Sequence, residues 1–316
     1  MMQALKYHKR GRGILFDQSG GVALVLVIWV IVVLIAIVGE FSYSMRTEIN
    51  ITRNFKEEEE SYQLAIAGIE MAKTELLAQN DLSRMYMNAD NVLVFDPDAE
   101  ELPERKADLG KGSFEYIIMD EDGKLNLNTA TPEQLRSIFQ TAGLEIEDVD
   151  TIVDSIMDWR DTDDLHLLSG AEDDYYESLE RPYSSKDGPF DSPDELLLVK
   201  GMKPEIFAGS GSDGEEGTGG VRQYFTVYGS GAVNMRTAPM EVIEALMGYD
   251  FALSIIEQRK TGGLTAPAEG GKTGSEFITI LSTGYNSDHS VKRTVKITVK
   301  RTGNKLETVH WNDNIV

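Results

Sequence analysis

The chain has 316 residues, a length that fits about two domains with cores of their own. It carries 53 acidic and 30 basic residues, and the net charge of −23 disfavours a protein that follows nucleic-acid phosphates, because such a protein needs a basic face. The sequence contains no Cys, which excludes disulfides, thiolate metal sites and a cysteine nucleophile.

The N-terminal segment combines a basic leader with a long apolar run. Residues 1–21 hold four Lys or Arg and one acid, and no charged residue occurs from 18 to 39. The apolar residues 22–38 are enough to cross a bilayer, which takes about 17–25 residues. Because the basic flank precedes the run, the positive-inside rule places the N-terminus in the cytoplasm and the rest outside. A cleaved secretory signal is the alternative, but the run exceeds the usual apolar region and no A-x-A-like site comes after it.

The composition predicts that this helix continues beyond the membrane. No Pro occurs between Val22 and Asp96, and residues 40–80 are rich in residues that favour helix. One face carries apolar residues at helical spacing, namely Tyr62, Ala65, Ile66, Ile69, Ala72 and Leu76. One helix over 22–79 would be roughly 87 Å long at about 1.5 Å per residue. We expect its first part to lie in the membrane and its second part to pack on a globular head.

Strand signals lie at both ends of the remaining chain. Residues 113–119 form the first, and residues 277–281 and 291–301 form the clearest, with apolar and polar residues alternating in the last. We expect these strands to share one antiparallel sheet. Residues 125–209 are then a helical insertion.

Two helix starts and two Gly-rich stretches organise the insertion and the segment after it. Thr131 before Pro132, and Ser192 before Pro193, are typical cap-and-Pro starts. We predict a flexible linker over residues 209–220 and a loop over 262–274, since both are rich in Gly.

One motif occurs twice. Residues 123–130 read GKLNLNTA and residues 231–238 read GAVNMRTA, each with a Pro-containing helix start after it. Asn126 and Asn234 can each bond local backbone and form a strand-to-helix turn. Thr129 and Thr237 are predicted to cap the helices. Asn128 completes the first copy, and an Arg stands in its place in the second.

The repeated motif resembles helix-hairpin-helix modules of DNA-uptake and DNA-binding proteins. Residues 145–195, however, contain 18 acids and three bases, a net charge of −15. Such a surface repels phosphates and has no basic groups to release counterions. We therefore predict a packing unit and no nucleic-acid partner.

The same acidic segment suggests a site for a hard cation. Asp161 and Asp163 have the alternate spacing with which loop carboxylates converge oxygen ligands on Ca²⁺. The segment is not an EF-hand, because His166 stands where the sharp turn demands Gly. Bound Ca²⁺ would relieve the mutual repulsion of the acids. A merely solvated acidic surface remains the alternative.

The leader resembles that of the prepilin class. A basic leader ends in Gly and leads directly into an apolar helix. The resemblance implies that a prepilin peptidase cuts between Gly21 and Val22 and leaves the helix on the mature protein. Major pilins and pseudopilins carry a Glu as the fifth mature residue, where this chain has Leu26. That departure suits a subunit at the end of a filament, with no neighbour for the Glu to engage.

Further motifs resemble the K-type minor pseudopilins of type II secretion systems. The first is Asp-Trp at 158–159 with acids at 161 and 163. The others are GAED at 170–173, Pro-Tyr at 182–183, and Glu-Leu at 195–196 with Val at 199 and Gly at 201. The resemblance implies an α+β fold with a pilin-type long N-terminal transmembrane helix, an antiparallel pilin-like sheet and a large inserted all-α domain of helix-hairpin-helix or SAM-like type. It also implies calcium in the acidic loops, carried onto Asp161, Asp163, Glu172, Asp173 and Asp191, and N-terminal methylation.

The predicted organisation combines these features. It comprises a leader (1–21), a transmembrane part (22–39), a pilin-like helix with the first strands (40–124), a helical domain with acidic loops and a linker (125–220), the second motif with its helix (221–260), and the C-terminal strands (261–316).

The expected function is structural and not enzymatic. The four His are scattered, no H-E-x-x-H motif occurs, and the Gly-Lys-Thr at 271–273 lacks the earlier Gly of a phosphate loop. By resemblance we expect a minor pseudopilin that sits in the inner membrane with a periplasmic head. It would cap or initiate the pseudopilus tip with I- and J-type minor pseudopilins and support export, with secreted substrates or the secretin as further partners. The alternative is a single-pass periplasmic calcium-binding or DNA-uptake protein that enters no filament.

Overall fold

The computed structural model describes residues 19–88, 90–98, 102–209, 220–260, 271–272 and 274–315. The chain divides into two compact units at Glu57 and Glu58. Most of the predicted leader, of the linker and of the second Gly-rich loop lies outside the described residues.

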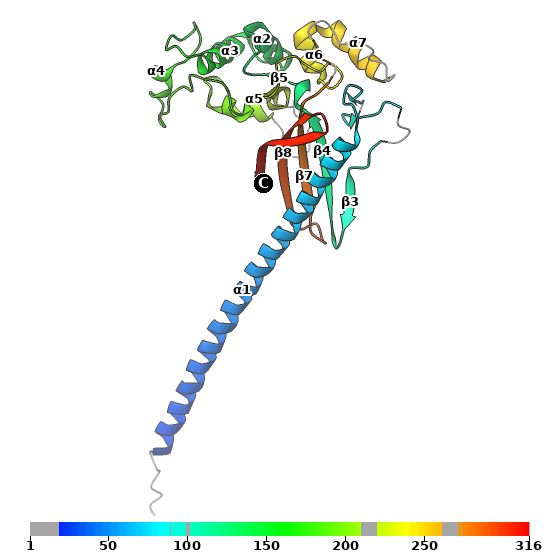
Figure 1. Ribbon diagram of the computed structural model, residues 1–316. Helices are drawn as coiled ribbons and strands as arrows, with labels where there is room; N and C mark the ends of the chain where they lie inside the picture. The colour runs from blue at the N-terminus through cyan, green and yellow to red at the C-terminus, as the bar shows by residue number, and fades with distance from the viewer. Residues whose placement is uncertain are drawn as a thin grey trace, which may run out of the picture. The chain divides into compact units, whose positions relative to one another are not determined.

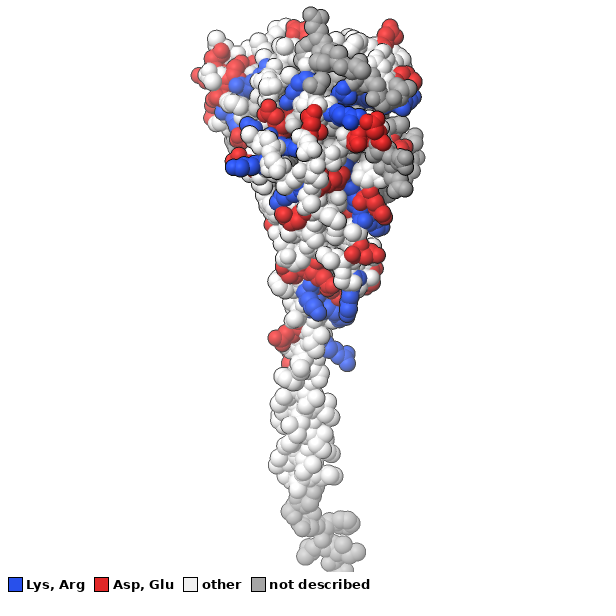
Figure 2. Space-filling model, turned by 45° about the vertical axis from the view of Figure 1, so that its right-hand side comes forward, with Lys and Arg blue, Asp and Glu red and all other residues white. Residues whose placement is uncertain are grey.

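The first unit contains the N-terminal part of helix α1 (Ser19–Ala78). Large apolar side chains from Val22 to Val38 are exposed on every side of the helix, so none of the described residues forms a core against this segment. Figure 2 shows this stretch free of Lys, Arg, Asp and Glu. Among the described residues, α1 is the one helix long and apolar enough to cross a membrane.

The second unit contains an antiparallel sheet with strand order β3-β4-β7-β8-β9 (Figure 1). Its strands are β3 (Lys106–Leu109), β4 (Gly112–Asp120), β7 (Phe277–Tyr285), β8 (Lys292–Thr302) and β9 (Lys305–Ile315). The predicted pairing of the early strand with the two late ones is confirmed. The edge strands β3 and β9 were not predicted, because their side chains are largely exposed and show no buried alternate face.

The C-terminal part of α1 packs on this sheet. Ala65, Ile69, Ala72 and Leu76 are fully buried at helical spacing. They share one core with apolar residues of β4, β7 and β8, including Ile118, Ile278, Ile280, Val295 and Ile297. The short strands β1 (Tyr86–Met87) and β2 (Leu93–Val94) pair beside this core.

Helix and sheet approach each other closely at Gly284 of β7. A Cβ atom at this position would lie 2.5 Å from the amide nitrogen of Ala65 and 2.8 Å from Cβ of Leu64. Backbone atoms of a helix that is itself packed cannot move aside cheaply. Gly284 therefore sets how tightly α1 lies on the sheet.

We expect Gly284→Ala to lower the free energy of unfolding by about 1–3 kcal/mol, the usual cost of overpacking a dense core. Denaturant unfolding monitored by circular dichroism measures this. Gly274→Ala is the matched control, since a Cβ there meets nothing within 4 Å. Equal stability of the two variants would contradict the proposed helix–sheet contact.

The helical insertion comes after β4. It contains helices α2 (Pro132–Thr141), α3 (Ile146–Arg160), α4 (Asp173–Tyr176), α5 (Pro204–Ala208), α6 (Met240–Met247) and α7 (Tyr249–Lys260), the 3-10 turns η1 (Glu121–Gly123), η2 (Pro193–Leu198) and η3 (Val221–Tyr224), and the parallel pair β5 (Leu125–Asn126) and β6 (Phe225–Thr226). Thr131 caps α2 with a full capping box, as predicted. Ser192 also forms a capping box, but the segment after it is a 3-10 turn.

The insertion has one core of its own. Buried residues from Leu125 to Ile255 belong to a single cluster, separate from the core under α1. The second motif and its helices, which the sequence sets apart as 221–260, contribute Phe225, Val242 and Ile255 to that same cluster.

Candidate functional site

The two copies of the repeated motif have the same local geometry. Asn126 Oδ1 accepts a hydrogen bond from the backbone N–H of Asn128 at 2.9 Å, and Asn234 Oδ1 accepts one from that of Arg236 at 3.1 Å. In each copy the amide of the final Ala donates to the backbone oxygen of the Asn, at 2.8 and 3.0 Å. The Asn side chain thus forms the predicted strand-to-helix turn in both copies.

An Arg completes each copy, partly buried in the first and buried in the second, and the sequence reasoning missed it. Arg160, at the end of α3, donates to the backbone oxygens of Leu127 and Ala130. Arg259, near the end of α7, donates to those of Met235 and Ala238, which occupy the same motif positions. The available signal was an Arg near the C-terminal end of the second helix after each motif.

The two motifs also pack against each other. A Cβ at Gly123 would lie 2.8 Å from Oγ1 of Thr237, and a Cβ at Gly231 would lie 3.0 Å from Cβ of Thr129. Each motif's first Gly thus admits the Thr of the other motif. The prediction that these Thr cap helices was wrong, because the chain runs two further residues before each helix begins. α2 is capped by Thr131, and α6 begins after Pro239 without a side-chain cap.

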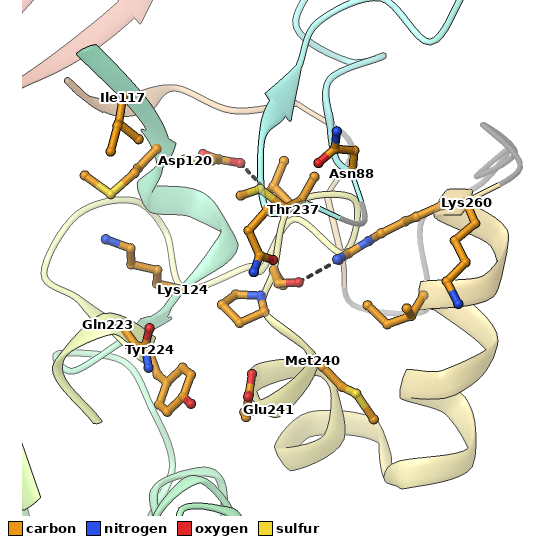
Figure 3. A pocket seen from close by; sticks show the side chains of 17 residues that line it. Asn88, Ile117, Asp120, Lys124, Gln223, Tyr224, Thr237, Met240, Glu241 and Lys260 are labelled. Atoms are coloured by element: carbon orange, nitrogen blue, oxygen red, sulfur yellow. Dashed lines mark hydrogen bonds between the residues drawn. The ribbon is translucent and has the colours of Figure 1, made fainter. Parts of the chain in front are cut away.

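The second motif is joined to the sheet through Asp120, the last residue of β4. Its Oδ2 accepts hydrogen bonds from Thr237 Oγ1 at 2.6 Å, from Asn234 Nδ2 at 3.1 Å and from Ser275 Oγ. Asp120 and Thr237 face each other in Figure 3. Burial raises the pKa of Asp120 to about 6, against the lowering effect of hydrogen bonds from Ser275 and Thr237.

This raised pKa predicts a pH-dependent stability. The folded protein binds the Asp120 proton more tightly than the unfolded chain, so the contribution is present below about pH 4 and is lost as pH rises through about 6. We expect wild type to lose stability relative to Asp120→Asn between about pH 4.5 and 7, as measured by urea unfolding at each pH. Asp98→Asn, an exposed change, serves as control. A difference between wild type and Asp120→Asn that does not change with pH would contradict the assignment.

The acidic loop after α3 is organised around Asp158, which is fully buried. Its carboxylate accepts hydrogen bonds from the backbone N–H of Leu167 at 3.1 Å and of Ala171 at 2.8 Å. Asp154 accepts another from Ser169 N at 3.1 Å, and Lys200 Nζ donates to the oxygens of Ser169 and Gly170. The loop backbone is therefore held in place on both sides.

Two predicted ligands lie beside this loop with unmet hydrogen-bonding capacity. Asp161 Oδ1 and Glu172 Oε1 are buried and have no hydrogen-bond partner among the residues that the structure describes. Burial, and then the charges of Asp158, Asp161 and Asp187, raise the pKa of Glu172 to about 7, although a hydrogen bond from Ser185 lowers it. Burial also raises the pKa of Asp161. Asp187, which the sequence reasoning did not select, has a left-handed backbone with φ of 50°.

The structure places the other predicted ligands differently. Asp163 is exposed and accepts from Leu165 N, and Asp173 Oδ1 accepts from both N and Oγ of Ser185. Asp191 is 90% exposed and pairs with Lys186 Nζ at 2.8 Å. Within the described part of the chain, no group of three or more His, Asp and Glu is arranged to hold a metal ion.

The predicted processing residues lie in the N-terminal part of α1. Gly21 and Val22 are helical in the uncut chain, and Leu26 is exposed with the other apolar residues of the run.

Comparison with known proteins gives consistent results. The family model of type II secretion system protein K matches residues 117–209. Type II secretion system protein K of Aeromonas hydrophila is 27% identical over 208 residues, which cover 60% of this chain and 61% of that protein. The putative protein K of Escherichia coli K12 is 23% identical over 205 residues, 60% of each chain. The chain thus matches about three-fifths of the length of these curated relatives.

A solved structure supports the fold. One chain of the GspK–GspI–GspJ complex from the type 2 secretion system of enterotoxigenic Escherichia coli matches with a TM-score of 0.60 and 15% identity, covering 84% of this chain and 99% of that one.

The fold defines the class of protein first. It is an α+β protein in which a long N-terminal apolar helix continues onto an antiparallel sheet and a helical domain is inserted into the sheet. The family model and both relatives are described as type II secretion system protein K, in line with the resemblance to K-type minor pseudopilins that the sequence indicates.

Proposed function

We propose that this protein is a minor pseudopilin that sits with I- and J-type minor pseudopilins at the tip of a type II secretion pseudopilus. The carrying observation is the fold, which places a helical insertion on a pilin-like helix and sheet and resembles a chain of the GspK–GspI–GspJ complex. Leu26 supports a terminal position, because it replaces the Glu expected to engage a neighbouring subunit. The protein would be anchored in the inner membrane with its head in the periplasm, cap or initiate the filament and thereby support export. Secreted proteins and the secretin are further candidate partners.

The proposal requires processing by the prepilin peptidase. Cleavage between Gly21 and Val22 removes the basic leader and leaves the apolar helix with a new amino terminus, the expected point of methylation. Removal of four bases and one acid changes the net charge from −23 to −26.

We expect the protein purified from membranes, co-expressed with the prepilin peptidase and I- and J-type pseudopilins, to begin at Val22 by mass spectrometry and to co-purify with both partners. Gly21→Leu should retain the leader, because a side chain there obstructs the scissile bond. A wild-type chain that keeps Met1 or Met2 would contradict the pseudopilin proposal. Correct processing without either partner would favour the alternative of a single-pass protein outside any filament.

We also propose that the acidic loops of the insertion bind Ca²⁺. Support comes from the two buried carboxylate oxygens of Asp161 and Glu172 without partners, with Asp187 close enough to raise the pKa of Glu172. Ca²⁺ takes about six to eight oxygen ligands in flexible geometry, so carboxylates and loop carbonyls suit it better than they suit Mg²⁺. Asp161 and Glu172 supply carboxylate oxygens of the kind that Ca²⁺ takes, although the described residues bring no third acid to the same point. Asp191 is already paired with Lys186. A bound cation would neutralise the repulsion and join loop segments that no disulfide can link.

We expect a chelator to lower the melting temperature of the full-length protein in detergent. Calcium at about 100 times its dissociation constant stabilises by about 2.7 kcal/mol, which corresponds to a shift of about 5–10 °C in a domain of this size. Glu172→Gln and Asp161→Asn should abolish the calcium-dependent shift, and Asp191→Asn should keep it. An unchanged wild-type melting temperature, or loss of the shift in Asp191→Asn alone, would refute this ligand assignment.

A further inference from the structure

A cavity of about 560 Å³ lies where β4, the loop around Asn88 and helices α6 and α7 meet. Its volume is that of a site for a small organic ligand. Ile117, Met240 and Ile256 contribute apolar wall, and Lys124, Arg259 and Lys260 contribute positive charge. Figure 3 shows Lys124 and Tyr224 on one side of the cavity and Lys260 on another.

Arg259 is the unusual group in this wall. The residue is only 6% exposed, and Nη2 donates to the backbone oxygens of Met235 and Ala238. Its Nε is buried and has no hydrogen-bond partner in the described part of the chain. Burial lowers the pKa of Arg259 to about 10, so the guanidinium remains charged at neutral pH. Among the described residues, no carboxylate raises the pKa of Arg259. A buried cation without a counter-charge is costly.

In the first copy of the motif, the corresponding Arg160 has a counter-charge, unlike Arg259. Arg160 makes the same two backbone hydrogen bonds, and burial lowers its pKa as well, but the adjacent Asp161 carboxylate opposes that change and supplies a counter-charge. Arg160 does not line the cavity. The unpaired charge is thus particular to the second copy and is not a requirement of the motif.

The other charged groups of the cavity are already paired. Lys124 Nζ lies 2.7 Å from Glu121, and Lys260 Nζ lies 2.8 Å from Glu257. The Asp120 carboxylate accepts from Thr237, Asn234 and Ser275, and Glu241 hydrogen-bonds to Tyr224. Arg259 is therefore the charged group of the described cavity wall that has no counter-charge.

We propose that this cavity binds a small carboxylate with an apolar body. The carboxylate lies beside the Arg259 guanidinium, which lines the cavity, and neutralises it, and the apolar body lies against Ile117, Met240 and Ile256. Such a ligand satisfies both properties of the cavity, its mainly apolar wall and its buried positive charge. The proposal concerns the head alone and does not depend on assembly into a filament.

Isothermal titration calorimetry of the full-length protein in detergent, with 4-phenylbutyrate as probe, tests the proposal. We expect saturable binding of the acid, and binding of the neutral amide, 4-phenylbutyramide, weaker by about ten-fold or more, the usual effect of losing a charge-assisted hydrogen bond. Arg259→Met should lose the preference for the acid. Ile256→Trp, which fills the cavity and keeps the Arg, should bind neither compound.

Arg160→Met is the matched control, because it loses the same two backbone hydrogen bonds away from the cavity. It should bind the acid as wild type does, and circular dichroism shows which variants remain folded. Glu269→Gln tests an acid of the chain itself, the Glu of the Gly-rich stretch 262–274, which follows α7 in the sequence. If this change strengthens binding of the probe, Glu269 is the native occupant and the proposal of a free ligand is overturned. Equal affinity for acid and amide, equal loss in Arg160→Met, or no binding to wild type also overturns it.

Discussion

The buried carboxylate of Asp120 holds the two halves of the head together. It ends β4, and it accepts hydrogen bonds from Thr237 and Asn234 of the second motif and from Ser275, two residues before β7. Asp122 continues the connection by accepting from the backbone of Phe277 and pairing with Lys272 at 2.7 Å. Two neighbouring carboxylates therefore position both the returning strand and the helical insertion. These donors offset only part of the desolvation of Asp120, whose pKa stays raised.

The insertion uses a duplicated motif as an internal packing device. Each Asn forms its turn, each Arg binds two backbone oxygens, and each Gly admits the Thr of the other copy. These polar groups are thus engaged inside the protein. The two copies differ mainly in how their Arg is compensated, by Asp161 in the first and by no described carboxylate in the second.

The negative charge of the chain is concentrated and not uniform. Residues 145–195 carry −15 of the total of −23. Part of this charge has a structural role, since Asp158 and Asp154 hold the loop backbone. Other acids have no such partner, because Asp161 and Glu172 each bury a carboxylate oxygen that makes no hydrogen bond to the described residues. Two other acids predicted as ligands from the sequence differ from these, because Asp163 is exposed and Asp191 is paired with Lys186.

Short-range patterns were enough to predict the local features of this protein from its sequence. The apolar run of α1, the alternation in β8 and the Thr131 cap before Pro132 each depend on residues a few positions apart, so spacing was sufficient to identify them. The resemblance to K-type minor pseudopilins also rests on short motifs. Other features became visible only in the folded chain. The edge strand β9 acquires its conformation by pairing with β8, and Arg160 and Arg259 reach the motifs from distant helix ends. The roles of Asp120, Gly284 and Asp187 depend on contacts between segments far apart in the chain, which no local pattern records, because burial and the pairing of charges are properties of the folded arrangement.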